Sequence, residues 1–202
     1  MQLPDAPSSR TPVQACFGAG TLVHTRNGQV PIELIQAGDF VLGQPEAGGE
    51  LAHKRVVNTA AYESREVCLV QYLLADEASP RSLMVTGNHP FWVQDEGWLP
   101  ARDLKTGCGL QLLGDVEAYV TGISPVLVAP DSGPGGCSPG DERPGNPPAS
   151  NDGRSPRTRV FNLEIEDCHT YFVGEAGVWV HNERFETSSL QAPCRDGAPR
   201  MR

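Results

Sequence analysis

Long apolar runs are missing from this chain of 202 residues. No window approaches the roughly 18 consecutive apolar residues of a membrane-spanning helix. The opening stretch, MQLPDAPSSRTPVQ, lacks both the basic and the apolar region of a signal peptide. We therefore expect no membrane partner, and a cytoplasmic location unless the domain is exported as part of a larger polypeptide.

Basic residues are few and scattered. The chain has 16 Lys and Arg against 25 Asp and Glu, with a formal net charge of -9. Nucleic-acid binding requires clustered basic side chains to meet the phosphates. The sequence therefore predicts no nucleic-acid partner.

Paired cysteines are also missing. The six cysteines form no C-x-x-C pair and no zinc spacing with the five histidines, so we expect no metal site and no cofactor. A chain of this size without a signal peptide does not need disulfides for stability. We expect most of the thiols to be free and the protein to be a monomer.

Convincing helical periodicity is absent, and short β-type runs separated by Gly, Asp, Asn and Pro take its place. The runs are TLVHT, QVPIELI, FVLG, RVVNTA, REVCLVQYLL, RSLMVTG, PFWV, GLQLLG and EAYVTGISPVLVA. Asn27-Gly28 between two runs predicts a β-hairpin. Residues 32–38 and 101–107 are each compatible with a single helical turn. The fold class predicted is an all-β domain with many tight turns.

Three segments lie outside the β pattern. Residues 1–15 are rich in Pro and Ser and have no periodicity, which predicts a flexible leader. Residues 183–202 have little apolar content, which predicts a flexible tail. Residues 130–158, of which 13 of 29 are Gly or Pro, predict a disordered insert. The insert has no core-forming periodicity, so we do not read it as a domain boundary.

The β-type runs resume after the insert with RVFNLEIE, HTYFVG and VWVHN. About 24 residues cannot form a domain alone, so these last strands must pair with the sheet built by residues 16–129. That pairing brings Asn182 toward Cys16.

The last run ends with His181 and Asn182. An Asn side-chain amide can attack its own backbone carbonyl, close a succinimide and release the peptide that follows. No cofactor is needed, because both reacting groups lie in one residue. The preceding His is placed to move protons. A His-Asn pair by itself fits equally a strand end followed by a polar turn.

Cys16 stands at the first residue where structure is expected. A thiol there can attack the carbonyl of Ala15 through a five-membered ring and convert the amide into a thioester. The structural alternative is a small buried residue, which is a common place for Cys.

Two further motifs offer groups for proton transfer. His89 lies between a turn and an aromatic strand and can act as a general acid with a pKa near neutrality, while the Thr86 hydroxyl orients it. Asp167 places a carboxylate near His169, which suits activation of the Asn182 amide. Each histidine also fits a surface position or a satisfied core position.

Four segments in order resemble the Hint (Hedgehog/intein) domains. They are CFGAGTLVHTRNGQVPIELIQAGDFVLG at the start, TGNHPFWV with GWLPARDLKTG in the middle, VFNLEIEDCHTYFVG late and VWVHN at the end. They are most similar to bacterial intein-like domains of polymorphic toxins, the pretoxin Hint type. The resemblance covers residues 16–182 except the insert.

The resemblance implies a compact horseshoe of short strands in which both junctions meet at one site. The residues that it assigns to the chemistry are Cys16, Thr86, His89, His169, His181 and Asn182. It implies an N-to-S acyl shift at Cys16, promoted by Thr86 and His89. It also implies that the other two histidines assist cyclisation of Asn182. The partners are then the domain's own flanking segments, and the activity is a single autocatalytic cleavage.

Two residues depart from the pattern of splicing inteins. Glu183 follows the terminal Asn, where an intein that splices has Cys, Ser or Thr to receive the acyl group. Asn162 stands where the late motif usually carries Asp, which weakens coordination of the middle steps. Both departures favour cleavage, chiefly at the downstream junction, over full splicing.

Two other functions remain open at this stage. Cys16, a histidine and Asn182 occur in the chain order of papain-like proteases that act in trans, although FGAGTLVHT is a poor helix for such a nucleophile. An inactive Hint-fold β module, retained as a linker or remnant, is favoured by the short flanks of 15 and 20 residues. We expect the cargo to lie outside this sequence.

Overall fold

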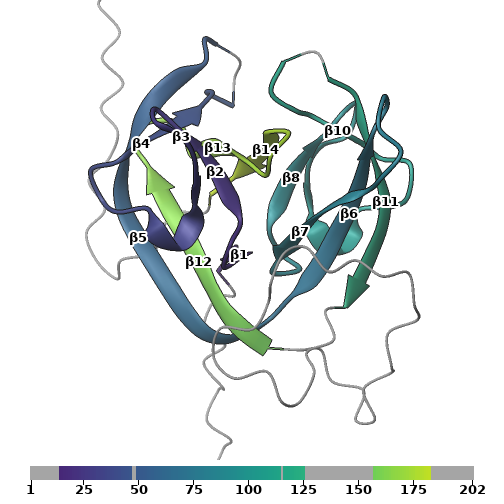
Figure 1. Cartoon of the computed structure of the whole chain (residues 1–202), viewed down its shortest axis with the longest axis horizontal. Coiled ribbons are helices and arrows are strands. Elements are labelled where there is room, and N and C mark those ends of the chain that lie inside the picture. The colour runs from purple at the N-terminus through teal and green to yellow at the C-terminus, as the bar shows by residue number, and fades with distance from the viewer. Residues whose placement is uncertain (1–13, 47–48, 115, 126–156, 183–202) are drawn as a thin grey trace, which may run out of the picture.

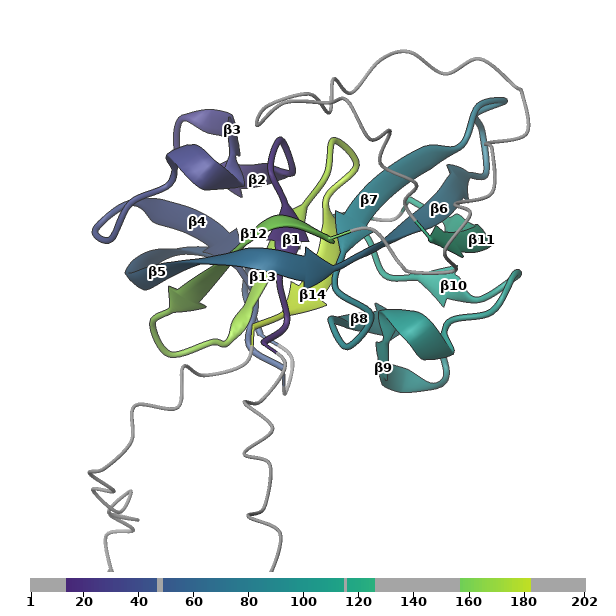
Figure 2. The same ribbon diagram turned by 90° about the horizontal axis from the view of Figure 1, so that it is seen from below.

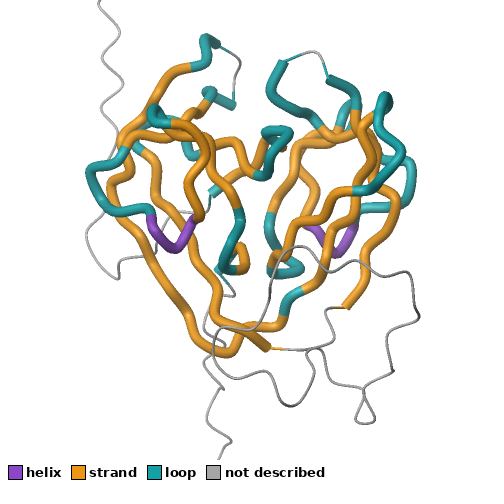
Figure 3. Tube along the Cα trace, in the orientation of Figure 1, coloured by secondary structure: helices purple, strands orange, loops and turns teal. Residues whose placement is uncertain are grey.

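The computed structural model describes residues 14–46, 49–114, 116–125 and 157–182 (Figure 1). The predicted leader up to residue 13, the insert at residues 130–156 and the tail from residue 183 lie outside these residues. Nearly every described element is a strand, which confirms the all-β class predicted from the short runs (Figure 3).

The elements fall into three sets along the chain. The first set is β1 (Phe17–Gly18), β2 (Leu22–Thr25), β3 (Gly28–Pro31), η1 (Ile32–Leu34), β4 (Phe40–Gly43) and β5 (Ala52–Glu66). The second is β6 (Cys68–Leu74), β7 (Arg81–Val85), β8 (Pro90–Val93), β9 (Gly97–Pro100), η2 (Ala101–Asp103), β10 (Gly109–Leu110) and β11 (Ala118–Pro125). After the insert come β12 (Arg157–Ile165), β13 (Thr170–Val173) and β14 (Val178–His181).

The local turns follow the chemistry of their residues. Thr25 pairs with Gly28 in the β2–β3 hairpin, and Gly28 has a φ of 98°, a left-handed conformation that Gly adopts with little steric cost. The hairpin predicted at Asn27-Gly28 is therefore present. Both predicted helical turns are present as 3-10 turns, η1 and η2.

Two elements differ in length from the prediction. β12 begins at Arg157, so residues 157 and 158 belong to a strand and not to the insert. β5 is a single strand of 15 residues, longer than the short run RVVNTA. It pairs with β12 from Glu66 opposite Arg157 to Val56 opposite Ile165.

The strands form one sheet that closes on itself. In the described residues the order is β10-β11-β6-β7-β1-β12-β5-β4-β2-β13-β14-β8-β9, and β10 also pairs with β8. Figure 1 shows the result as a horseshoe of two lobes, β2–β5 and β6–β11, joined by the β5–β12 ribbon. Figure 2 shows β1, β12 and β14 between the lobes. The first and last strands of the domain therefore lie near its centre.

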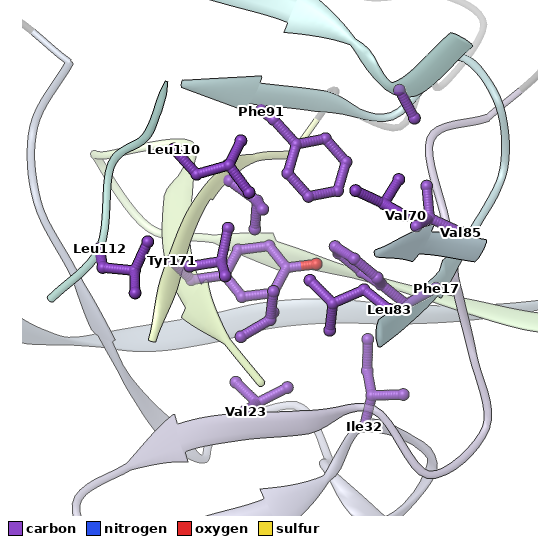
Figure 4. Packing of buried hydrophobic residues seen from close by; sticks show 14 of the residues in the cluster. Phe17, Val23, Ile32, Val70, Leu83, Val85, Phe91, Leu110, Leu112 and Tyr171 are labelled. Atoms are coloured by element: carbon purple, nitrogen blue, oxygen red, sulfur yellow. The ribbon is translucent and has the colours of Figure 1, made fainter. Parts of the chain in front are cut away.

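The core fills the space between these central strands (Figure 4). Phe17 of β1 makes edge-on ring contacts with Phe91 of β8, at 6.5 Å between centroids, and with Tyr171 of β13, at 6.3 Å. All three side chains are fully buried. Because β1, β8 and β13 share this packing, the positions of both ends of the domain depend on one core.

Candidate active site

The upstream junction is fixed by the pairing of β1 with β7. Phe17 lies opposite Val85, and one further step along this register places Cys16 opposite Thr86. Two hydrogen bonds agree with that placement: the Thr86 amide donates to the Cys16 carbonyl at 2.9 Å, and the Cys16 amide donates to Thr86 Oγ1, also at 2.9 Å. Thr86 thus holds the nitrogen of the Ala15–Cys16 peptide bond.

The Thr86 hydroxyl reaches both sides of that peptide bond. Its Oγ1 lies 3.3 Å from the carbonyl oxygen of Gln14 and 3.4 Å from that of Cys16, either of which can accept its proton. Cys16 is 0% exposed and packs with Val67 and Val160. Ala15 is equally buried, so this peptide bond is shielded from bulk water.

The downstream junction is fixed by the pairing of β14 with two neighbours. Val180 lies opposite Phe91 of β8, and two further steps place Asn182 opposite His89. On the other side the Asn182 amide donates to the His169 carbonyl at 2.7 Å. Asn182 is 0% exposed. The last residue of the domain is therefore held between two of the predicted histidines.

One tight turn connects the two junctions. The His89 amide donates to the Thr86 carbonyl at 3.0 Å, so the residue opposite Cys16 and the residue opposite Asn182 are three positions apart. The sequence prediction that pairing of the last strands brings Asn182 toward Cys16 agrees with this arrangement.

His89 is more deeply buried than the prediction assumed. Its ring packs on Phe17 at 4.0 Å between centroids, and neither ring nitrogen has a hydrogen-bond partner among the described residues. Burial, with a smaller effect from His181, lowers the pKa of His89 from 6.5 to about 3. The expectation of a pKa near neutrality is wrong, because the cost of desolvating a charged imidazole favours the neutral ring.

The Asn182 side chain is held by the main chain of β12. Its Nδ2 donates to the Leu163 carbonyl at 2.6 Å, while its Oδ1 has no hydrogen-bond partner in the described part of the chain. The side-chain amide nitrogen is therefore held by a hydrogen bond, and the amide oxygen is buried without a donor among the described residues.

Asn162 connects this contact to the upstream junction. β1 pairs with β12 at Phe17 opposite Phe161, and one further step places Cys16 opposite Asn162. Its Oδ1 accepts the Leu163 amide at 2.9 Å, and its Nδ2 has no partner among the described residues. Asn162 is 0% exposed, so a buried polar residue lies opposite Cys16 and adjoins Leu163, whose carbonyl binds the Asn182 side chain.

The turn before β13 positions His169 by its backbone. Asp167 and His169 have φ values of 62° and 45°, a left-handed conformation that is uncommon outside Gly, Asn and Asp. This turn directs the His169 carbonyl toward the Asn182 amide. The Asp167 carboxylate lies 3.8 Å from Lys54 Nζ, with its side chain 76% exposed.

His181 has a partner that the sequence did not suggest. Its Nε2 lies 2.6 Å from Oε1 of Glu46, in the segment between β4 and β5. Its ring also packs edge-on against Trp98 at 5.3 Å and lies 6.4 Å from His169. Neither Glu46 nor Trp98 belongs to a motif that marks a proton-transfer site, so only the folded structure brings them to His181.

No group of three or more His, Cys, Asp or Glu side chains among the described residues is arranged to hold a metal ion. None of their helices has the length and apolar character to cross a membrane. Cys68, Cys108 and Cys168 form no disulfide, and Cys137 and Cys194 lie outside the described residues.

These features define a class of protein. A closed β fold places a cysteine before its first strand and an asparagine after its last strand, both beside one buried turn. Each residue can react with its own peptide bond. This is the architecture of a self-processing β domain.

Comparisons with known proteins agree with that class. Residues 22–121 match the pretoxin Hint domain family. The solution structure of a bacterial intein-like domain from Clostridium thermocellum is similar, with 29% identity and a TM-score of 0.60 over 83% of this chain and 98% of that one. The gp41-1 intein gives 17% identity and a TM-score of 0.56 over 84% and 100%. A DnaB intein from Synechocystis sp. PCC 6803 gives 15% and 0.58 over 84% and 99%. No curated protein gives a significant sequence match.

The resemblance to Hint domains of the intein-like type that the sequence shows is confirmed by the family match and by these structures. The horseshoe fold predicted from that resemblance is confirmed as well. The family as a whole is one of self-processing domains.

Proposed function

We propose that the domain cleaves its own polypeptide, by an N-to-S acyl shift at Cys16 and by cyclisation of Asn182. The convergence of the two junctions on the Thr86–His89 turn carries this proposal. The substrates are the flanking segments of the same chain, so the domain acts once, as a monomer and without a cofactor. Cleavage after Asn182 is its main activity.

The upstream step breaks the bond between Ala15 and Cys16. Cys16 Sγ attacks the Ala15 carbonyl carbon, the S–C bond forms, the C–N bond breaks, and the thiol proton ends on the Cys16 nitrogen. The Thr86 hydroxyl, 2.9 Å from that nitrogen, is placed to pass the proton. Neutral His89 can donate a hydrogen bond with its N–H, whereas its burial disfavours a protonated ring.

The downstream step breaks the bond between Asn182 and Glu183. Asn182 Nδ2 attacks the Asn182 carbonyl carbon, a succinimide closes, and one proton passes from Nδ2 to the departing Glu183 nitrogen. The Leu163 carbonyl holds Nδ2 in place, and His181 and His169 border the junction. Asp167, ion-paired with Lys54 on the surface, supports the turn that carries His169.

Cleavage, not ligation, is the outcome that the sequence supports. Glu183 offers a carboxylate where a spliced product needs a hydroxyl or thiol that can rearrange to an amide. Asn162, opposite Cys16, cannot ionise as the usual Asp does. The thioester then reacts with water or an added thiol, and the two junctions act separately.

A cysteine protease acting in trans fits the geometry poorly. Cys16 and His89 are both 0% exposed, so a second polypeptide cannot reach the nucleophile without opening the core. The remaining alternative is an inactive Hint-fold β module. It differs from the proposal only in reactivity, which a direct test can measure.

The test uses unrelated reporter domains fused to both ends of the full chain, with intact mass followed over time. We expect loss of the downstream reporter, leaving a succinimide or Asn at position 182, and no such loss in Asn182→Ala. Cys16→Ala should stop thiol-induced loss of the upstream reporter and leave the other junction active. Ligated reporters would overturn the cleavage assignment, and a parent that stays intact even with thiol would establish the inactive module.

A further inference from the structure

We propose that Glu46 is a positioning residue for the downstream cleavage, acting through His181. Its carboxylate fixes which nitrogen of the His181 ring carries the proton and which nitrogen is left for chemistry. This inference rests on the proposed function, because it assigns a task within the cyclisation of Asn182.

The contact itself points to a defined tautomer. A carboxylate can only accept a hydrogen bond, so His181 Nε2, at 2.6 Å from Glu46 Oε1, must carry the hydrogen. In a neutral ring the remaining nitrogen, Nδ1, then has a lone pair. Nδ1 is bonded to Cγ and lies nearer the main chain than Nε2 does. The contact therefore leaves Nδ1, the nitrogen nearer the main chain that continues into Asn182, as the proton acceptor.

The ring is also confined by aromatic side chains. Trp98 meets it edge-on, at 5.3 Å and an interplanar angle of 72°. Trp98 packs in turn against Trp92 and Trp179, at 5.1 and 5.0 Å between centroids, so all three tryptophans of the chain support one histidine. Packing of this kind restricts where the ring lies, but apolar edges do not select the protonated nitrogen. Glu46 supplies that selection.

The proton balance of the cyclisation explains why the selection matters. Nδ2 of Asn182 loses a proton as it attacks, and the Glu183 nitrogen needs a proton as it leaves. A histidine with a bare Nδ1 can take the first proton and return it to the leaving nitrogen, without change in the Glu46 contact. A ring with its hydrogen on Nδ1 cannot begin this transfer.

Glu46 is suited to a test because little of the fold depends on it. Its side chain is 42% exposed and that of His181 is 23% exposed, and ion pairs this open to solvent contribute little to stability. Removal of the carboxylate should therefore change the chemistry at one junction and leave the fold and the other junction intact.

The experiment compares the full chain with Glu46→Ala, Glu46→Gln and a control, Glu50→Ala, which alters an exposed glutamate in the same segment. General acid–base catalysis contributes about 10²- to 10⁴-fold, so we expect Glu46→Ala to slow downstream cleavage by about tenfold to a hundredfold. Glu46→Gln should lie between, because an amide can accept from Nε2 but can equally donate to it. Thiol-induced cleavage at Cys16 should be unchanged in all variants.

A second measurement reads the tautomer directly. ¹⁵N NMR of the His181 ring, in chains carrying Asn182→Ala to prevent reaction, should give the Nε2–H form in the parent and a mixture in Glu46→Ala. Selective slowing together with the tautomer change supports the inference. Downstream cleavage at the parent rate in Glu46→Ala overturns it, as does equal slowing at both junctions. A parent chain that never cleaves overturns the proposed function instead, and is recognised because the Asn182→Ala control then behaves identically.

Discussion

The two junctions of this domain differ in the solvent exposure of the side chains around them. At the upstream junction Cys16, Thr86 and His89 are all at most 1% exposed. At the downstream junction Asn182 is equally buried, but His181 reaches the surface and contacts the exposed Glu46. One junction therefore keeps its protons inside the core, while the other connects to water through a histidine and a carboxylate.

Burial and proton supply are therefore arranged separately in one site. In the proposed upstream reaction the proton stays in the core, because it only has to pass from the Cys16 thiol to the Cys16 nitrogen. In the proposed downstream reaction a proton moves between the Asn182 side-chain nitrogen and the Glu183 nitrogen, and a histidine in contact with solvent can exchange its proton with water. Four sets of substitutions test whether the two junctions differ in this way.

The largest effect should be the pH dependence caused by burying His89. Its pKa falls from 6.5 to about 3 on folding, so in acid the unfolded chain takes up a proton that the folded chain does not. The contribution to the free energy of unfolding is complete above pH 6.5 and is lost toward pH 3, by about 1.4 kcal/mol per pH unit. Urea unfolding measured at several pH values between 7 and 4 should show that the free energy of unfolding falls less steeply with decreasing pH in His89→Phe than in the parent. The same dependence on pH in both proteins would contradict the burial argument.

The next effect should come from Thr86→Val, which keeps the shape of the side chain and removes its hydroxyl. The Cys16 amide then loses its acceptor at 2.9 Å, and the proton loses its path to the leaving nitrogen. Loss of one such positioned group costs about 10²-fold in rate, so thiol-induced cleavage at Cys16 should slow by that order while downstream cleavage continues. Thr121→Val, at an exposed position on β11, is the control. Equal slowing of both junctions would count against a local role.

Alanine substitutions at two glycines, one near each junction, should destabilise the fold to different extents. A Cβ on Gly43 would lie 2.7 Å from the Thr170 carbonyl oxygen, in the strand that leads toward the downstream site. A Cβ on Gly18, beside the upstream site, would lie 2.7 Å from the flexible Met84 side chain. Overpacking against backbone costs about 1–3 kcal/mol, so Gly43→Ala should lower the urea midpoint more than Gly18→Ala. The opposite order would show that the upstream side is the more rigid one.

The smallest effect should follow Tyr171→Phe, in the core shared by both junctions. The Tyr171 hydroxyl is buried without a hydrogen-bond partner among the described residues, and burial raises the pKa of Tyr171. Removal of an unsatisfied hydroxyl is neutral or stabilising, by about 1 kcal/mol or less. Thermal unfolding and both cleavage rates should stay near those of the parent. Slower cleavage at either junction would instead give the hydroxyl a part in the reaction.

Much of the fold could be predicted because its signals are local. The Asn27-Gly28 hairpin and the two single turns depend on residues within a few positions of each other. The length of β5 could not be predicted in this way. Most of its side chains are exposed or half-buried on both faces, so no alternation of polar and apolar residues marks where it begins or ends.

The candidate site also has features that the sequence predicts and features that depend on the folded structure. The meeting of Cys16 and Asn182 was predicted because the last strands had no other partner. The contact between Glu46 and His181 could not be, because it joins a polar segment to a residue 135 positions away. The pKa of His89 could not be predicted from the sequence either, because it depends on burial by residues such as Phe17 that are distant in the sequence.

The closed order of the strands has a consequence for the domain after the proposed cleavage. Both bonds proposed for cleavage lie outside the hydrogen-bonded ladders, since β1 begins at Phe17 and β14 ends at His181. Cutting either bond therefore removes no pairing between strands, and the spent domain should retain the hydrogen-exchange protection of its precursor. The reaction is then driven forward by the departure of the released chain and not by any relaxation of the sheet, which persists as a folded by-product.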